Sequence, residues 1–514
     1  MDKKNVVLLG ASNSRVPGGL EAGLNQDNIN FTNLSLGSTS SLHKLYCLQK
    51  NQEIFKKTDL IIIESNIVDV FIYSELDSRI AINNIIYLYD ELIQYKQKII
   101  ILILFTPGIN NININFINNL HKYKANEYGY NVIDVHDIVK NNNLNDFYMK
   151  PDCHHMLSSI MYQLGKNIAN NITYFHFPYN KNKQFNHQFK IITPDQLELL
   201  NGTRKQNVIK YFYTEKATKI TKGDLYKIPN KYNGFKLIGM HAFNNTKSKI
   251  ISKNISLNPS FSYSSLLISN SYSKLIKSAC GYNIFYDIKK NIFIDNNTTI
   301  SLNQNFEFSE ISQMVFKFDN YINTLDYINL VSLFAIKEDP NVIKNINYDW
   351  LYQAEVNIDE KYNFDHLVPD LLLVKESIEE YCIKMDPIKL EPLQNQINTL
   401  KTQLSNTQAN SAKARIQNQL SYKLGQAMIE NSKSILGYIR MPYVLSYIKD
   451  KHKQEQKIYQ EKIKKDPSLK LPPLESYADY NEALKFKEHL SYKLGEALIK
   501  ANNNWYGGVY QIVV

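Results

Sequence analysis

Residues 1–14 read MDKKNVVLLGASNS, a short apolar run that ends at a glycine and a Ser-Asn-Ser cluster. The run is too short for the apolar core of a signal peptide and fits a buried β-strand. A serine directly after a first strand lies at the carboxyl edge of a parallel sheet, where open α/β folds bind their ligands. Serine and asparagine are also the commonest helix caps, so Ser12 taken alone is better explained as a cap than as a nucleophile.

The chain that follows alternates apolar runs with helical stretches. Strands are expected at 5–9, 30–36, 60–64, 99–105 and 131–135. The longest run, IIILILF at 99–105, is too short to cross a bilayer. Helix-like segments lie at 41–55, 78–97, 112–128 and 156–171. Runs of β-branched residues separated by helices predict a parallel sheet covered on both faces.

Three later loops carry polar residues in the same setting. LSLGS at 34–38 follows the second strand and brings Gly37, where the backbone is expected to approach closely. ESNIVD at 64–69 follows the third strand and brings Asn66. PDCHH at 151–155 precedes the last helix and brings Asp152 and His155. Because carboxyl ends of parallel strands meet at one edge, we expect these residues to gather near Ser12.

This ordered series of Ser, Gly, Asn and DxxH resembles the SGNH (GDSL-like) hydrolase superfamily over residues 1–172. The resemblance implies a flavodoxin-like three-layer α/β/α fold and a catalytic triad with Ser12 as nucleophile and His155 as general base. Asp152 would orient the imidazole and stabilise its charged form. The amides of Ser12 and Gly37 and the side-chain amide of Asn66 would form the oxyanion hole.

Two positions depart from the family pattern. The Asp that usually precedes the serine is Ala11 here, a change that also occurs in relatives that modify polysaccharides. The Gly that usually lies two residues before the Asn is Glu64, which brings the backbone geometry of that loop into question. Glu64 is therefore a further candidate for the site.

Neighbouring residues offer alternatives within the same motifs. Ser14 and His154 are rivals for the roles of Ser12 and His155, and the spacing of both motifs favours Ser12 and His155. Asn13, between the two serines, is a further candidate site residue.

Composition limits the other functions. The chain has 514 residues, 44% hydrophobic and 21% charged, so two to four folded units are expected. Its net charge is +10, with the clearest basic concentration at 449–470. No zinc-finger spacing, RNP-like segment or Gly-rich phosphate loop accompanies it, so no nucleic-acid partner is predicted.

The cysteine, histidine and aspartate residues do not show the spacing of a metal-binding site. Four cysteines, Cys47, Cys153, Cys280 and Cys382, form no CxxC pair and indicate the reduced thiols of the cytoplasm. The cluster Asp134, His136 and Asp137 is interpreted as a solvated turn. We therefore predict neither a metal nor a cofactor.

The pattern of apolar residues changes after residue 172. Short alternating and aromatic runs over 173–345, without helices between them, predict an antiparallel β-sandwich of the jelly-roll type. Such sheets often hold sugars, so this is a candidate glycan-binding domain by analogy of fold. Tyrosines on its strands suit either packing or stacking on sugar rings. They are Tyr211, Tyr213, Tyr263, Tyr282 and Tyr286.

Residues 346–514 are expected to be helical. An apolar stripe from 390 to 404 predicts a short helix that packs on a neighbour, with a coiled coil as the alternative. LSYKLGQAMIENSKS at 420–434 recurs as LSYKLGEALIKANNN at 490–504, which favours a packing or oligomerisation module. Residues 415–505 are similar to tails of bacterial capsule and lipooligosaccharide enzymes, among them O-methyl phosphoramidate transferases.

Together these patterns favour a transferase that modifies a sugar hydroxyl of a bacterial surface polysaccharide through a covalent Ser12 intermediate. The transferred group is an acyl group, as in an O-acetyltransferase, or an O-methyl phosphoramidate, with an acyl-CoA or a nucleotide-linked donor. The alternatives are an esterase that removes acyl groups from a glycan and a non-catalytic carbohydrate-binding protein. The expected location is the cytoplasm, with the C-terminal helices docked on the inner membrane or on other capsule enzymes.

Overall fold

The computed structural model describes most of the chain. The described residues are 3–75, 77–106, 111–148, 154–179, 187–211, 213–244, 263–305, 307, 309–310, 325–339, 348–409 and 411–503. Asp152 and Cys153 lie outside these ranges. The chain divides into two compact units, Met1–Ser377 and Ile378–Val514. Among the described helices, none has the length and apolar character needed to cross a membrane.

The first unit begins with a sheet of parallel strands in the order β2-β1-β3-β4-β5. They are β1 (Lys4–Leu9), β2 (Ile29–Asn33), β3 (Leu60–Glu64), β4 (Lys98–Ile103) and β5 (Asn131–Asp134). This is the flavodoxin-like order, in which the direction of winding reverses at β1 and β3. The predicted parallel sheet is confirmed.

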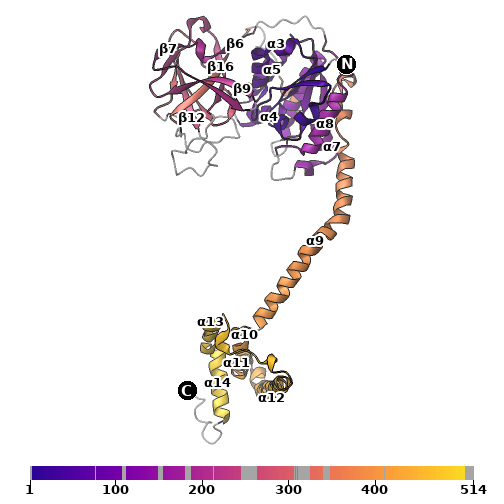
Figure 1. The fold of residues 1–514 in the computed structure, drawn as a ribbon, viewed down its shortest axis with the longest axis vertical. Coiled ribbons are helices and arrows are strands. Elements are labelled where there is room, and N and C mark those ends of the chain that lie inside the picture. Colours follow the sequence, from indigo (N-terminus) through magenta and orange to yellow (C-terminus); the bar gives the residue numbers. More distant parts are fainter. Residues whose placement is uncertain are drawn as a thin grey trace. The chain divides into compact units, whose positions relative to one another are not determined.

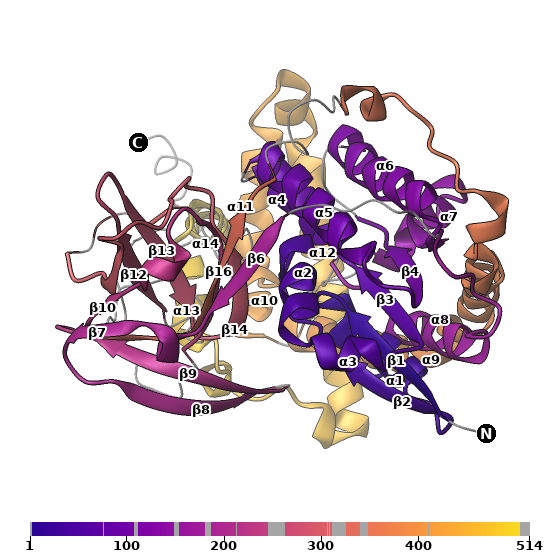
Figure 2. The ribbon, with the colours of Figure 1, turned by 90° about the horizontal axis from the view of Figure 1, so that it is seen from above.

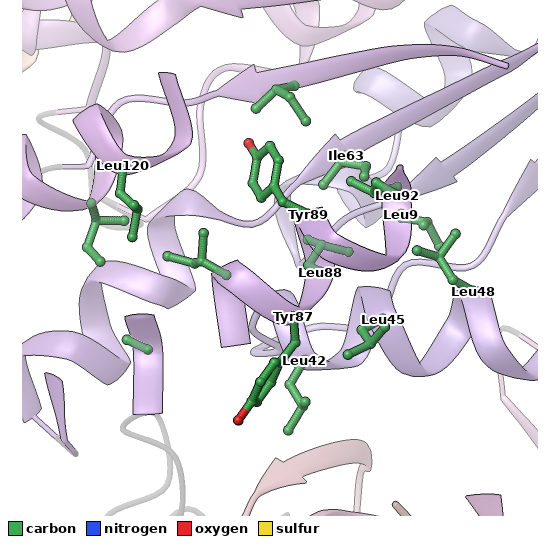
Figure 3. Packing of buried hydrophobic residues seen from close by; sticks show 14 of the residues in the cluster. Leu9, Leu42, Leu45, Leu48, Ile63, Tyr87, Leu88, Tyr89, Leu92 and Leu120 are labelled. Atoms are coloured by element: carbon green, nitrogen blue, oxygen red, sulfur yellow. The ribbon is translucent and has the colours of Figure 1, made fainter. Parts of the chain in front are cut away.

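Alternate side chains of the strands enter two separate cores. Val7 and Ile61 pack with α2 (Ser41–Lys50), α5 (Ser78–Leu92) and α6 (Asn111–Tyr128). Val6 and Ile62 pack on the other face with α1 (Leu20–Leu24), α7 (Val135–Asn141) and α8 (Ser158–Asn170). Figure 3 shows part of the first core, where side chains of α2 and α5 meet those of the strands. The expected three layers are therefore present.

Helices α2 and α5 also have a second sheet on their far side (Figure 2). Phe285 and Phe334 of that sheet belong to the same buried cluster as the two helices. The Tyr46 hydroxyl lies 2.9 Å from Ser332 Oγ, and Lys50 pairs with Glu215 at 2.7 Å. The α/β domain and the following domain thus share a continuous buried interface.

The following domain consists of two antiparallel sheets packed around one core. The sheet next to α2 contains β14 (Asn283–Asp287), β11 (Lys236–Phe243), β16 (Tyr327–Lys337), β9 (Tyr213–Thr221) and β8 (Lys205–Tyr211), with β6 (Gln188–Ile192) on β16. The other contains β13 (Lys274–Cys280), β12 (Tyr263–Ser269), β15 (Thr299–Leu302), β10 (Leu225–Lys227) and β7 (Glu198–Asn201). The antiparallel character is as predicted, and jelly-roll connectivity stays a prediction.

The chain then returns to the α/β domain. Residues 348–370, expected to begin the helical region, form short 3-10 turns instead. Leu351 enters one core of the α/β domain and Leu367 the other. The Phe364 amide donates to the carbonyl of Val132 in β5 at 2.9 Å. This segment is therefore part of the first unit.

Helix α9 (Leu371–Ala409) follows as a single long helix (Figure 1). The apolar stripe predicted to pack on a neighbour is exposed along it: Leu390, Leu393, Ile397, Leu400 and Leu404 are each at least 43% exposed. The sequence pattern predicted a helix here, but the helix is not short, and its stripe is exposed because burial depends on a partner and not on spacing.

In the second unit, the two LSYKLG copies form α11 (Leu420–Asn431) and α14 (Leu490–Asn503), which pack on each other. A side chain on Gly425 would overlap the carbonyl of Ser491, and one on Gly495 would overlap the carbonyl of Ser421. The repeated Ser-xxx-Gly spacing thus places the smallest residues where the helices cross. α10 (Ala412–Gln417), α12 (Ile435–Lys465) and α13 (Tyr480–Leu484) complete the described α-helices of this unit.

Candidate functional site

The predicted site residues lie where the winding of the parallel sheet reverses. The turn with Ser12 follows β1, the loop with Gly37 follows β2, and Glu64 ends β3. In this sheet β1 lies between β2 and β3, so the three segments leave the same edge side by side. Open α/β folds bind ligands in the crevice at such a point.

Ser12 and Gly37 lie next to each other. Ser12 is partly exposed and precedes a 3-10 turn, Asn13–Arg15, without capping it through its side chain. A Cβ on Gly37 would lie 3.9 Å from Ser12 Cβ, with no other described atom that near. The close backbone approach expected at Gly37 stays a prediction. Among the described residues, a side chain at this position would be in ordinary contact with Ser12.

Asn13 joins the Ser12 turn to the loop that carries the histidines. Its Nδ2 donates to the carbonyl of His154 at 3.1 Å, and its Oδ1 accepts from the amide of Met156 at 3.3 Å. His155, between them, is half-buried, and His154 is exposed. The His154 ring stands at 69° to that of Phe71 in α4 (Asn66–Glu75), with centroids 5.9 Å apart. The structure thus brings the first and last sequence motifs together.

Glu64 lies fully buried beneath the Ser12 turn. Its Oε2 accepts from the amide of Ala11 at 2.7 Å and from the hydroxyl of Ser14 at 3.0 Å. Ser14 is itself fully buried and donates its hydroxyl to this carboxylate, whereas the Ser12 side chain carries no such bond to Glu64. Glu64 therefore binds the chain before Ser12 through a backbone amide and the chain after it through the Ser14 side chain.

The position of Asn66 corrects the expected oxyanion hole. Its Nδ2 donates to the carbonyl of Leu104 at 2.9 Å and to Oδ1 of Asn118 at 3.0 Å. Its Oδ1 accepts from the Leu104 amide at 3.0 Å. An amide nitrogen has two hydrogens, and both are used within the fold. In this conformation Asn66 ties the start of α4 to the residue after β4 and offers no hydrogen to an oxyanion.

Several polar residues that support the site were not singled out in the sequence. Gly10, at the end of β1, donates its amide to Ser35 Oγ at 2.7 Å. Arg15 donates to the carbonyls of Asn33 and Ser35 at 2.7 and 3.1 Å. These bonds fix the Ser12 turn to the loop after β2. The sequence signal that could have identified this support is Arg15, a charged residue directly after the Ser12-Asn13-Ser14 cluster.

A second polar cluster lies under α2. Asp69 accepts from the amide and hydroxyl of Ser41 at 2.9 and 2.6 Å and lies 3.2 Å from His121 Nε2. All three side chains are buried, so this Ser-His-Asp set is closed to a substrate. It anchors the start of α2 to α4 and α6.

The cluster at Asp134 is not the solvated turn that we expected. Asp134 is buried, and Lys122 forms ion pairs with both Asp134 and Asp137 at 2.5 Å. The buried Lys122 therefore neutralises the Asp134 and Asp137 carboxylates through ion pairs. Within the described part of the chain, no three His, Cys, Asp or Glu side chains are grouped as metal ligands.

Tyr286 is not available to stack on a sugar ring. It is fully buried in the sandwich core, where its hydroxyl accepts from the Cys280 amide at 2.8 Å. Tyr282 packs partly buried against the same core. For Tyr211, Tyr213 and Tyr263 the side chains lie outside the described structure.

Residues 345–514 match the family described as "Domain of unknown function (DUF8374)". No curated protein matches the chain. Solved structures similar to it include the lipase/acylhydrolase from Enterococcus faecalis, at 17% identity and a TM-score of 0.28 over 35% of this chain and 100% of that one. A member of the lipolytic G-D-S-L family from Veillonella parvula has 17% identity and a TM-score of 0.27 over 33% and 97%. A catalytic mutant of an acetylxylan esterase from Geobacillus stearothermophilus has 14% identity and a TM-score of 0.26 over 34% and 94%.

Proposed function

We propose that this protein is a serine-dependent enzyme of the SGNH kind that transfers a group to a sugar hydroxyl of a bacterial surface polysaccharide. The observation that carries the proposal is the junction of Ser12, Gly37 and the 154–156 loop where the sheet reverses its winding. It unites residues far apart in the sequence, and each has the type that acyl-transfer chemistry needs.

In the proposed reaction, Ser12 Oγ attacks the carbonyl carbon or phosphorus of an activated donor as the His155 imidazole takes its proton. The donor's leaving group departs with that proton, and the group stays on Ser12. The acceptor hydroxyl then gives its proton to His155 as its oxygen attacks, and Ser12 Oγ leaves and regains the proton. The amides of Ser12 and Gly37 would stabilise the developing oxyanion. Asp152 would orient His155.

The group is an acyl or an O-methyl phosphoramidate, because the same base and amide donors serve attack at carbon or at phosphorus. The donor would be an acyl-CoA or a nucleotide-linked compound, and the acceptor a capsular or lipooligosaccharide sugar. The likeness of residues 415–505 to tails of capsule enzymes is the support for that acceptor.

A fluorophosphonate probe tests the nucleophile. We expect wild type to gain one adduct, located on Ser12 by peptide mass analysis, and Ser12→Ala to gain none. Ser432→Ala, at an exposed serine of the second unit, is the matched control and should label as wild type does. Incubation with an acyl-CoA or a nucleotide-linked phosphoramidate should leave the transferred group on the same peptide.

Two results would favour the other functions. Rapid turnover of p-nitrophenyl acetate without an acceptor, lost in Ser12→Ala, would identify an esterase. A wild-type protein that takes no label would indicate a non-catalytic carbohydrate-binding protein. The two internal bonds of the Asn66 amide are the observation that favours this last alternative.

The C-terminal helices are proposed to dock the enzyme at the inner face of the membrane or on other capsule enzymes. In α12 the side chains of Ile435, Ile439 and Tyr443 are at least 66% exposed at a spacing of four residues. Residues 449–465 of the basic segment 449–470 continue the same helix, as in helices that bind anionic lipid. If the full chain does not sediment with phosphatidylglycerol vesicles, docking on the membrane is rejected.

A further inference from the structure

A fully buried lysine of α2 lies beside the loop that carries Gly37. Lys44 has no exposed surface, so it is not placed to contact a substrate. A buried amino group is costly unless hydrogen bonds replace the water that it has lost. An apolar side chain would fill this position in the core at a lower cost, so the lysine needs a reason other than packing.

The hydrogen bonds of Lys44 go to the end of the Gly37 loop. Its Nζ donates to the Thr39 carbonyl at 2.6 Å and to Thr39 Oγ1 at 3.3 Å. Thr39 is the last loop residue before Ser40, which caps α2. Lys44 therefore binds both the backbone and the side chain at the point where the loop meets the helix.

Thr39 in turn holds the loop around Gly37. Its buried Oγ1 donates to the Leu36 carbonyl at 2.5 Å and lies 3.2 Å from His43 Nδ1. The bond from residue 39 back to residue 36 encloses Gly37 and Ser38. Ser38 has a φ of 57°, a left-handed conformation that costs free energy in a residue with a side chain. The Thr39 hydroxyl is part of what holds this conformation.

The beginning of the same loop is bonded to the strand that leads to Ser12. The Leu36 amide donates to the Gly10 carbonyl at 3.3 Å, and Ser35 Oγ accepts from the Gly10 amide at 2.7 Å. Gly37 therefore lies between two fixed points, one on the Ser12 strand and one on α2. Its place relative to Ser12 depends on both.

We propose that Lys44 and Thr39 are positioning residues, which hold the Gly37 amide where an oxyanion formed at Ser12 accepts its hydrogen. The inference rests on the proposed function of Ser12. Asn66 gives both of its amide hydrogens to the fold, so the expected oxyanion hole is reduced to backbone amides, whose placement the loop controls.

The rate of fluorophosphonate labelling at Ser12 in the full chain tests this role, because the phosphonyl oxygen takes the place of the oxyanion. Lys44→Met keeps the length of the side chain and loses the amino group. Thr39→Val keeps the shape and loses the hydroxyl. We expect each to slow labelling about tenfold or more at saturating probe, with the half-saturating probe concentration little changed, because a misplaced donor slows chemistry more than binding. Thr39→Ser keeps the hydroxyl and should label close to the wild-type rate.

Tyr46→Phe is the matched control, on the same helix. The Tyr46 hydroxyl is buried on the sandwich side of α2, 2.9 Å from Ser332 Oγ and 3.2 Å from His241 Nδ1. Its loss should lower the melting temperature, as the loss of a buried hydrogen bond does, and leave the labelling rate below that temperature unchanged. Should Lys44→Met not fold, the contrast between Thr39→Val and Thr39→Ser still tests the loop.

The double variant of Lys44→Met and Thr39→Val should be slowed by less than the product of the two single factors, since both changes act on one contact. Wild-type labelling in either single variant, a slowing by the full product, or an equal slowing in Tyr46→Phe would overturn the positioning role while Ser12 remains the nucleophile. Wild-type protein without label at Ser12 would instead remove the proposed function, and this inference with it.

Discussion

Gly10 and Gly37 lie on two sides of Ser12 and have opposite surroundings. A side chain at position 10 would overlap the Ser14 hydroxyl, which the buried Glu64 holds in place. Among the described residues other than its chain neighbours, a side chain at position 37 would meet Ser12 Cβ, at the ordinary contact distance of 3.9 Å. The first glycine is required by the fold, whereas the described surroundings of the second would accept a methyl group.

This contrast predicts different effects of the same substitution. Gly10→Ala should lower the free energy of unfolding by about 1–3 kcal/mol, because the added methyl group overpacks a buried turn. Gly37→Ala should leave the melting temperature near that of wild type and slow labelling of Ser12 by a bulky fluorophosphonate. Thermal unfolding and labelling measured on both variants check this. Equal melting temperatures for the two variants would contradict it.

At the scale of elements, the LSYKLG repeat is a helix-crossing motif. Ser421 and Gly425 of α11 face Ser491 and Gly495 of α14, and each glycine lies against the other helix's serine carbonyl. Small residues four apart let two helices approach closely, as they do in helix pairs of other proteins. Each copy of the repeat therefore provides one of the two helices in this contact. This agrees with the packing role that the sequence favours.

Gly425→Val should separate the two helices. The side chain would overlap the Ser491 backbone, which cannot move as a flexible side chain would. We expect a loss of about 1–3 kcal/mol in the stability of the second unit, a shift of several degrees in its unfolding. Gln426→Val, at the adjacent exposed position, controls for the helix propensity of valine. Matching unfolding curves for the two variants would argue against the crossing.

At the scale of the molecule, the contact between the α/β domain and the sandwich is polar as well as apolar. His241 of β11 is fully buried there, with Nδ1 3.2 Å from the Tyr46 hydroxyl and Nε2 2.6 Å from Asn283 Oδ1. Asp287 accepts from Ser40 and Asn84 across the same boundary. The sandwich is thus fixed against the helix that begins just after the Gly37 loop.

His241 makes this interface sensitive to acid. Burial lowers the pKa of His241 from 6.5 to about 4. Between pH 6.5 and 4 the unfolded chain binds a proton at His241 that the folded protein does not. The stability that neutral, buried His241 contributes is therefore present above pH 6.5 and is lost as the pH falls toward 4. Relative to His241→Gln, wild type should lose about 3 kcal/mol of unfolding free energy between pH 7 and 4. Urea unfolding of both proteins across this range measures it, and parallel pH profiles would refute it.

The local sequence by itself determined the α/β sheet, the order of its elements and the chain positions of the candidate site residues. Runs such as 60–64 and 99–105 are apolar on both faces, a pattern that depends on strand geometry and needs no knowledge of the neighbours. The repeat at 420–434 and 490–504 likewise marked a helix pair before its crossing was known.

Only the tertiary structure decided what surrounds those residues. Lys44 is buried where it bonds Thr39 in the loop after β2, and Asn66 gives its amide to Leu104 and Asn118 because β4 and α6 lie beside it. Burial and hydrogen-bond partners are set by segments distant in the sequence, which no local pattern records. For Ser12, the sequence supplied a hydroxyl after a strand; the fold placed the buried Glu64 carboxylate under the turn and Gly37 beside it.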